Sequence, residues 1–215
     1  QNIDHAHPSL ALATLATPQL SFTTRRRNGV YYTDSRLARH LATRSRRALQ
    51  SAEAWLDPAC GSGILLVAAA LEVAGDDASR RHEIVTNRVF GADLSADAIR
   101  GARLALASLG SDESCISALD DHLRVADSLL RRERLWTDVA PGGFGAVLGN
   151  PPWEKLKVSR HEFLRAQGVL RHYGAEIDGL EASALRSEKA RLAAYIAAAT
   201  DGMQLQGTGE ADLYK

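Results

Sequence analysis

From residue 52 onward, short apolar runs alternate with longer stretches that have the apolar spacing of helices. Strands are predicted at 54–56, 88–92, 122–126 and 144–148, and helices at 64–74 and from Ser95 to about Leu109. Strands that alternate with helices in this way form a parallel sheet. The sequence therefore predicts an α/β fold, with a mostly parallel sheet that carries helices on both of its faces.

A polar side chain directly follows, or comes within two residues of, the end of each predicted strand. These residues are Asp57, Asp93, Asp127 and Asn150. In open α/β sheets, ligands bind at this carboxyl edge of the strands. Asp93 alone is also typical of a helix cap, and Asp127 of a surface turn. Three acids in register at successive strand ends favour a ligand site over these two structural explanations.

The loop Asp57-Pro58-Ala59-Cys60-Gly61-Ser62-Gly63 lies between a predicted strand and a predicted helix. It is not the dinucleotide fingerprint, because Leu66 occupies the place of the third glycine, and no Gly-Lys-Ser/Thr of a P-loop follows. Asp57 would repel a pyrophosphate, but it suits a cofactor with cationic groups. S-adenosylmethionine carries an ammonium and a sulfonium and no phosphate, so the loop favours this cofactor.

The two later acids can hold the rest of such a cofactor. A carboxylate at Asp93 can accept hydrogen bonds from both ribose hydroxyls, and Leu94 beside it can pack on the adenine ring. Asp127 can accept from the adenine amino group. We therefore predict that the cofactor lies along the strand ends from Asp57 to Asp127.

The segment Asn150-Pro151-Pro152-Trp153 follows the last predicted strand. An amino group on a heteroaromatic ring is a poor nucleophile because its lone pair is delocalised into the ring. If the Asn150 oxygen and the Pro151 carbonyl each hold one of its hydrogens, the nitrogen can direct its lone pair at an electrophile. Proline has no N–H to compete, and Trp153 can stack on the ring. The structural alternative is a strand closed by a rigid turn, with Trp153 packed in the core.

The regions on either side of this core are predicted to be mostly helical. A helix capped by Asp34 or Ser35 runs to about Gln50. Within the core, residues 76–87 are predicted to form a polar loop. After the core, helices are predicted at about 160–173 and 180–200. We expect an N-terminal segment at 1–50, a core at 51–153, and an insertion or the start of a substrate-side region at 154–215. Basic residues gather on the first helix and just before it, where they either contact phosphates or form a solvated face. They are Arg25, Arg26, Arg27, Arg36, Arg39, Arg44, Arg46 and Arg47.

Composition narrows the functional classes. With 26 basic and 26 acidic residues there is no net charge, so contact with a nucleic acid depends on local clusters. The absence of a long apolar run or a signal peptide favours a cytoplasmic protein that does not enter a membrane. Cys60 and Cys115 are isolated and the seven histidines lack ligand spacing, so neither a disulfide framework nor a metal site is expected. The chain begins with Gln and ends within an apparent element, so we expect a truncated fragment.

These motifs, in their order, resemble those of the adenine-specific DNA methyltransferases of bacterial restriction-modification and phage-defence systems. The segment Gly29-Val30-Tyr31-Tyr32-Thr33 is similar to the family's N-terminal cofactor motif, 57–63 to its glycine loop, and 150–153 to its catalytic motif. The arrangement is similar to that of type I and type IIG enzymes. Asp34 stands where the family usually has proline, and Trp153 replaces the commoner tyrosine or phenylalanine.

The resemblance implies a Rossmann-like methyltransferase fold that uses S-adenosylmethionine. It implies that Asn150, Pro151, Pro152 and Trp153 are catalytic. It also implies a set of cofactor-binding residues: Tyr32, Thr33, Asp57, Ala59, Gly61, Gly63, Asp93, Leu94 and Asp127. The target is an adenine flipped out of double-stranded DNA, and the methyl group is transferred directly to its amino nitrogen without a covalent enzyme intermediate.

Sequence specificity is expected to lie outside this chain, in a further domain or subunit. Two alternatives remain open. The four-residue motif also suits a glutamine amide in a protein or a base in RNA, although the Tyr-Tyr-Thr motif ahead of the glycine loop favours DNA. In the second alternative, the chain binds the cofactor but is an inactive subunit or fragment.

Overall fold

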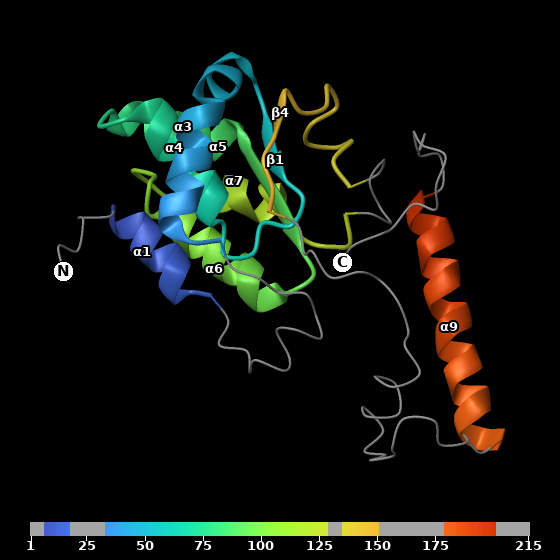
Figure 1. Cartoon of the computed structure of the whole chain (residues 1–215). Helices are drawn as coiled ribbons and strands as arrows, with labels where there is room; N and C mark the ends of the chain where they lie inside the picture. The colour runs from blue at the N-terminus through green and yellow to red at the C-terminus, as the bar shows by residue number, and fades with distance from the viewer. Residues whose placement is uncertain (1–6, 18–32, 129–134, 151–178, 201–215) are drawn as a thin grey trace. The chain divides into compact units, whose positions relative to one another are not determined.

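The computed structural model describes residues 7–17, 33–128, 135–150 and 179–200, drawn in colour in Figure 1. The chain divides into two compact units, residues 1–151 and 152–215. The first contains the sheet and the candidate site. The described part of the second is one helix, α9 (Gly179–Thr200), which confirms the helix expected at 180–200. The helix expected at 160–173 lies outside the described residues.

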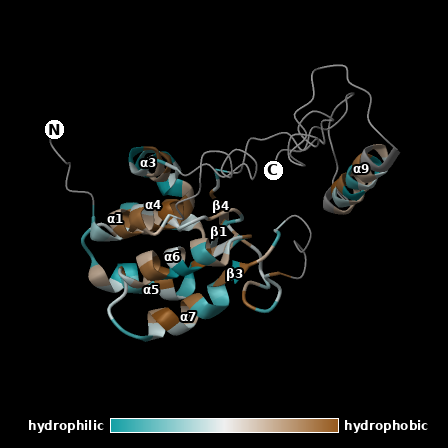
Figure 2. Ribbon diagram, turned by 90° about the horizontal axis from the view of Figure 1, so that it is seen from below, coloured by the Kyte–Doolittle hydropathy of each residue, from teal (hydrophilic) through white to brown (hydrophobic). Residues whose placement is uncertain are grey.

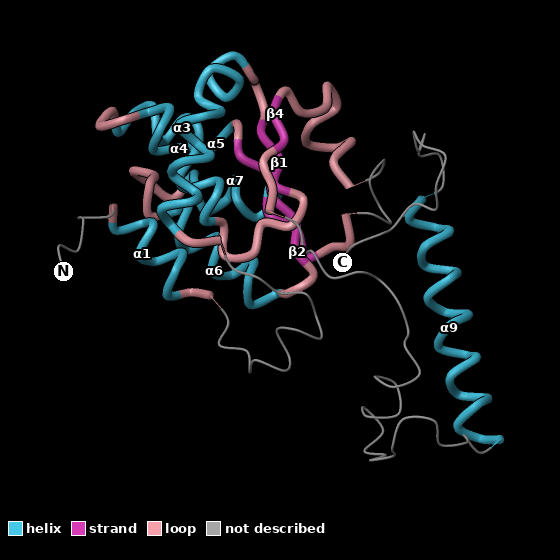
Figure 3. Tube along the Cα trace, viewed as in Figure 1, coloured by secondary structure: helices cyan, strands magenta, loops and turns pink. Residues whose placement is uncertain are grey.

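The first unit is built on a parallel sheet of four strands in the order β3-β2-β1-β4 (Figure 3). The strands are β1 (Trp55–Asp57), β2 (Val89–Asp93), β3 (Leu123–Val125) and β4 (Ala146–Val147). Asp57 is in register with Gly91, and Asp93 with Val125, so the ends of these parallel strands form the predicted carboxyl edge. The four strands confirm the predicted ones: β1 and β2 have the predicted lengths but are shifted by one residue, and β3 and β4 are shorter at both ends.

Six described helices accompany the sheet. They are α1 (Pro8–Leu15), α3 (Ser35–Ser51), α4 (Ile64–Ala74), α5 (Ala78–Asn87), α6 (Ala96–Ala107) and α7 (Ser114–His122). Asp34 caps α3 by accepting from Arg36 N at 2.9 Å, as predicted, and Ser95 caps α6 by accepting from Ala98 N at 3.2 Å. Helix α4 is hydrophobic along most of its length (Figure 2), which fits its place in the core.

The prediction of a polar loop at 76–87 is wrong, because α5 occupies most of it. The stretch 79–83 is polar or charged, and this hid the helical pattern. Ile84 and Val85 are both fully buried, and Asp77 caps the helix by accepting from Arg80 N at 3.0 Å. Two apolar residues and a cap are therefore enough, in this tertiary setting, to fix a helix with a charged outer side.

The two faces of the sheet are covered differently. Trp55 and Val89 point to the face where all six helices pack. Leu56 and Phe90, one residue later on each strand, point to the other face, against Trp136 and Phe144. The Phe90 ring lies 5.9 Å from Trp136 and 5.4 Å from Phe144, in edge-to-face contacts. In the described residues, the expected helical cover is thus present on one face, and a loop segment (135–144) covers the other.

None of the helices in the described ranges is both long enough and apolar enough to cross a membrane.

Gly63, which ends the glycine loop, is held in a conformation that other residues rarely adopt. Its φ is +80°, and an added Cβ would lie 3.0 Å from the Cβ of Ala102 on α6. We predict that Gly63→Ala lowers the free energy of unfolding by about 1 to 3 kcal/mol, measured by urea denaturation. Gly142→Ala is the matched control, because its added Cβ meets open space. Equal stability of the two variants would contradict this packing role.

Candidate functional site

A cavity of about 250 Å³ opens at the carboxyl edge of the sheet. It brings together five residues that the sequence analysis selected: Thr33, Asp57, Ala59, Gly61 and Asn150. Asn150 and Thr33 are 117 positions apart in the sequence. The parallel topology brings Asn150 close to Asp57, because β1 and β4 are neighbours and their carboxyl ends reach the same edge.

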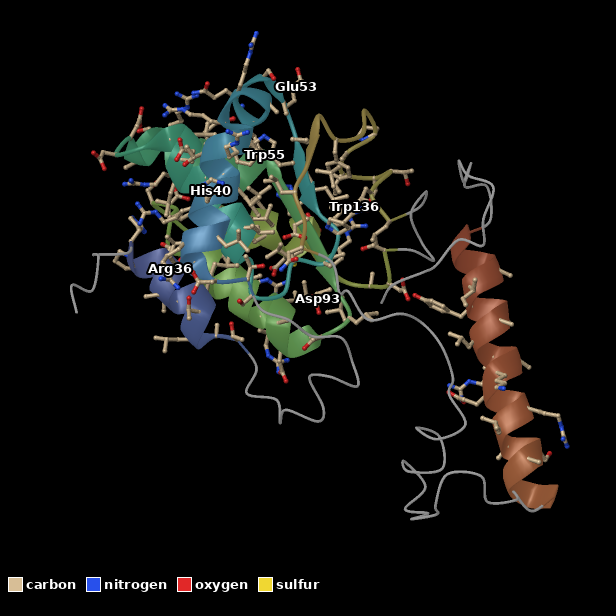
Figure 4. All side chains as sticks on the ribbon, in the orientation of Figure 1. Arg36, His40, Glu53, Trp55, Asp93 and Trp136 are labelled. Atoms are coloured by element: carbon tan, nitrogen blue, oxygen red, sulfur yellow. The ribbon has the colours of Figure 1, made fainter. Side chains whose placement is uncertain are left out.

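The glycine loop is tied to the next strand by the Asp93 carboxylate. Gly61 N donates to Asp93 Oδ2 at 2.9 Å, and Ser95 N donates to Asp93 Oδ1 at 2.8 Å. Gly61 has φ +52°, which favours glycine and turns its N–H toward the acid. Asp93 therefore has a structural role: it holds Ser95, the residue that caps α6, and it also positions the glycine loop. Figure 4 labels Asp93 within the first unit.

Asp57 is the most unusual ionisable residue of the site. Asp57 is only 1% exposed, and its Oδ1 accepts a hydrogen bond from Ala59 N at 3.1 Å. Burial raises the pKa of the Asp57 carboxyl to about 7; the Ala59 hydrogen bond opposes the rise, and the charge of Asp93 adds to it. A buried acid of this kind is poised to ionise when a cationic group arrives beside it.

Asn150 is oriented by Thr33. Its side-chain nitrogen donates to Thr33 Oγ1 at 3.2 Å. An amide that donates from its nitrogen presents its oxygen at the opposite end of the group. A threonine of the N-terminal cofactor motif thus fixes the side chain that the sequence analysis selected as catalytic.

Four of the predicted cofactor residues do not line the cavity: Gly63, Asp93, Leu94 and Asp127. Leu94 is 61% exposed, and Gly63 packs against α6. Ser128, next to Asp127, donates to the carbonyl of Pro58 at 2.8 Å and so holds the end of β3 close to the glycine loop. These residues form the edge beside the cavity. Tyr32, Pro151, Pro152 and Trp153 lie outside the described residues.

Several residues of the cavity wall were not predicted from the sequence. They are Thr14, Thr17, Cys60, Ser62, Ile64 and Leu65. Cys60 is buried, and burial, with the charges of Asp57 and Asp93, raises the pKa of its thiol well above the ordinary value. Position in the glycine loop could have identified Cys60 and Ser62. The segment with Thr14 and Thr17 has mixed small and apolar residues without a periodic pattern, and no signal in it pointed to the site.

The chemistry of the wall fits S-adenosylmethionine. The lining residues offer one carboxylate and four hydroxyls, and none of these described residues is Lys, Arg or His. An acceptor-rich wall with a buried acid suits a ligand with an ammonium and a sulfonium, and it disfavours a phosphorylated one. A parallel sheet with a glycine loop after its first strand and acids at the following strand ends defines a Rossmann-like methyltransferase fold.

The chain belongs to the N-6 DNA methylase family, whose family model matches residues 19–169. The match covers the glycine loop, the strand-end acids and the segment 150–153, and it confirms the resemblance to adenine-specific DNA methyltransferases. A search of curated proteins and one of solved structures find no match.

Proposed function

We propose that this protein transfers a methyl group from S-adenosylmethionine to the exocyclic amino group of adenine in double-stranded DNA, in restriction-modification or phage defence. The observation that carries this proposal is the meeting of Asp57, Thr33 and Asn150 in one cavity. Asp57, which suits a cationic cofactor, and Asn150, which suits a planar amine, therefore lie in the same cavity.

The residues that would hold the cofactor follow from the wall. Asp57 pairs with the ammonium group, and the backbone of the loop at Ala59 and Gly61 lies against the cofactor chain. Asp93 accepts from the ribose with its remaining lone pairs, and Leu94 and Asp127 contact the adenine. When bound, S-adenosylmethionine would supply a methyl group carried on a sulfonium; the electrons of the broken carbon–sulfur bond would stay on sulfur, so that S-adenosylhomocysteine is the product.

The target base is handled by the segment 150–153. Asn150 Oδ1 and the Pro151 carbonyl accept the two amino hydrogens of a flipped adenine, so that its nitrogen can direct a lone pair at the methyl carbon. Trp153 stacks on the base, while Pro152 keeps the backbone stiff. Thr33 supports the step by holding the Asn150 amide at 3.2 Å. The nitrogen releases one proton after transfer.

Transfer of labelled methyl groups separates this proposal from its rivals. Duplex DNA, single-stranded RNA and a glutamine-containing peptide are offered with labelled S-adenosylmethionine under identical conditions. Label on DNA supports the proposal. Label on RNA or on the peptide alone would mean that the substrate is RNA or protein instead of DNA. Tight cofactor binding without transfer to any of the three would favour an inactive subunit.

The basic face of α3 is a candidate contact for the DNA backbone. The helix begins at Ser35, two residues after Thr33 of the cavity wall. Its outer face carries Arg36, Arg39, His40, Arg44, Arg46 and Arg47, all exposed; Figure 4 labels Arg36 and His40 on it. Asp34 pairs with Arg36 and Glu72 with Arg46. Within the helix itself there is no acidic residue, so all of its own charged side chains are basic, although Arg36 and Arg46 pair with acids outside it.

We predict that Arg44→Gln with Arg47→Gln weakens binding to duplex DNA of any sequence. Each phosphate contact contributes about 0.9 to the slope of log affinity against log salt, so the double variant should lose about 2 from that slope. Fluorescence anisotropy at several salt concentrations measures this. Arg191→Gln on α9 is the control. An unchanged slope would mean that the α3 face is simply solvated.

A further inference from the structure

Helix α1 lies outside every motif of the sequence analysis, yet its C-terminal end forms part of the cavity wall. Thr14 is in its last turn and Thr17 is two residues beyond its end. Both line the cavity together with Asp57, Gly61 and Asn150. The cavity therefore has a wall from α1 in addition to those from the glycine loop and from Thr33.

This wall is fixed in place. Leu10 and Ala13 of α1 are at most 2% exposed, and the helix packs against α4 and α6. Ser9 Oγ lies 2.6 Å from Ser108 Oγ, which anchors the first turn. At the other end, Gly101 of α6 lets the chain approach so closely that an added Cβ would lie 2.8 Å from Ala16. The orientation of Thr14 and Thr17 is thus set by packing on both sides.

The hydroxyl protons of the two threonines are already committed. Thr14 Oγ1 donates to the Leu10 carbonyl at 2.9 Å, and Thr17 Oγ1 donates to the Ala13 carbonyl at 3.1 Å. Thr17 Oγ1 also lies 3.2 Å from Ser62 Oγ. Because a hydroxyl has a single proton, Ser62 is the donor in that contact. Toward a ligand, the oxygens of Thr14 and Thr17 can only accept.

Acceptors that face a cavity with a buried acid recognise a donor with several protons. An ammonium has three N–H groups, and Asp57 satisfies at most two of them with its two oxygens. On the basis of the proposed function, we propose that Thr14 and Thr17 are cofactor-binding residues, which accept hydrogen bonds from the ammonium group of S-adenosylmethionine. Helix α1 thereby selects ligands that carry the amino-acid part of the cofactor.

The test compares ligands with and without that part. S-adenosylhomocysteine contains the ammonium group, and 5′-methylthioadenosine lacks the whole amino-acid portion. Isothermal titration calorimetry gives the Kd of each for wild type, Thr14→Val and Thr17→Val. We expect each valine variant to raise the Kd of S-adenosylhomocysteine about tenfold and to leave that of methylthioadenosine unchanged. Serine at either position should restore the affinity, because the hydroxyl is kept.

Two controls separate direct contact from loss of structure. Ser9→Ala loosens the anchor of α1 but replaces no residue of the cavity wall, and Thr43→Val removes an exposed hydroxyl that bonds Glu72 on the outer side of α3. Neither should discriminate between the two ligands. An equal loss for both ligands in the valine variants, or no loss for either, would overturn this inference alone. A wild-type protein that binds neither ligand would overturn the proposed function as well.

Discussion

Replacing Asn150 by alanine should lower kcat for DNA methylation by about 10²- to 10³-fold and leave the Kd of S-adenosylhomocysteine within about threefold of wild type. The magnitude is that of removing one preorganised polar group that acts on the charge developing in the transition state. In the proposed mechanism the amide acts on the amino nitrogen of the target, so its loss should affect chemistry more than cofactor affinity. Single-turnover methylation of duplex DNA, with cofactor titration alongside, measures both quantities.

The matched control is Asn87→Ala, at the end of α5. This exposed asparagine uses its side-chain nitrogen to donate to the Glu83 carbonyl, and it lies outside the cavity wall. It should methylate like wild type. Thr33→Val should give an intermediate loss of kcat, because Asn150 is still present but its side chain loses the hydrogen bond that orients it. An Asn150→Ala rate within a few-fold of wild type would contradict the assigned role.

Asp57→Asn should raise the Kd of S-adenosylmethionine on the order of 100-fold. The reason is that a buried charge pair loses one partner when the carboxylate becomes a neutral amide. In the proposed cofactor site, binding requires the ionised carboxylate, and burial raises the pKa of Asp57 to about 7 in the folded protein without cofactor. Affinity should therefore rise as the pH increases from about 6 to 7.5, below the range in which the cofactor amine loses its own proton. The asparagine variant should lack this rise.

The same residue makes the unliganded protein less stable as the pH increases. The folded pKa of Asp57 lies above the ordinary value of 3.8, so the folded state binds more protons than the unfolded state between pH 3.8 and about 7. The free energy of unfolding then falls with rising pH, by an amount on the order of 3 kcal/mol between about pH 5 and 8. Urea denaturation of wild type and Asp57→Asn measures the difference between them.

Asp121→Asn is the control for both effects. This exposed carboxylate lies just before β3, at the opposite edge of the sheet from the cavity. It should follow wild type in cofactor affinity and in the pH dependence of stability. If Asp57→Asn shows the same pH dependence as wild type, the carboxyl does not titrate as described.

Much of the site could be predicted because its residues follow from topology. A strand that ends at Asp57 and a strand that ends just before Asn150 bring those side chains to one edge as soon as the strands are parallel neighbours. The glycine loop was visible from residue types alone, and Gly61 and Gly63 do have positive φ. Local chemistry also located the helix starts at Asp34 and Ser95.

The parts that escaped prediction depend on tertiary packing. Helix α5 buries only Ile84 and Val85, so its sequence looks like a polar loop until the core is present. Helix α1 carries small and apolar residues around its circumference, and the cavity role of Thr14 depends on contacts with α4 and α6. The roles of Asp93 and Gly63 were only partly visible, since their backbone contacts cannot be derived from spacing.

The central claim is that this chain methylates adenine in DNA. The most direct measurement incubates the protein with S-adenosylmethionine and unmethylated duplex DNA, digests the DNA to nucleosides and identifies them by mass spectrometry. We expect N6-methyldeoxyadenosine with wild type and almost none with Asn150→Ala. A mark on cytosine, or no mark on DNA from a protein that binds the cofactor, would contradict it.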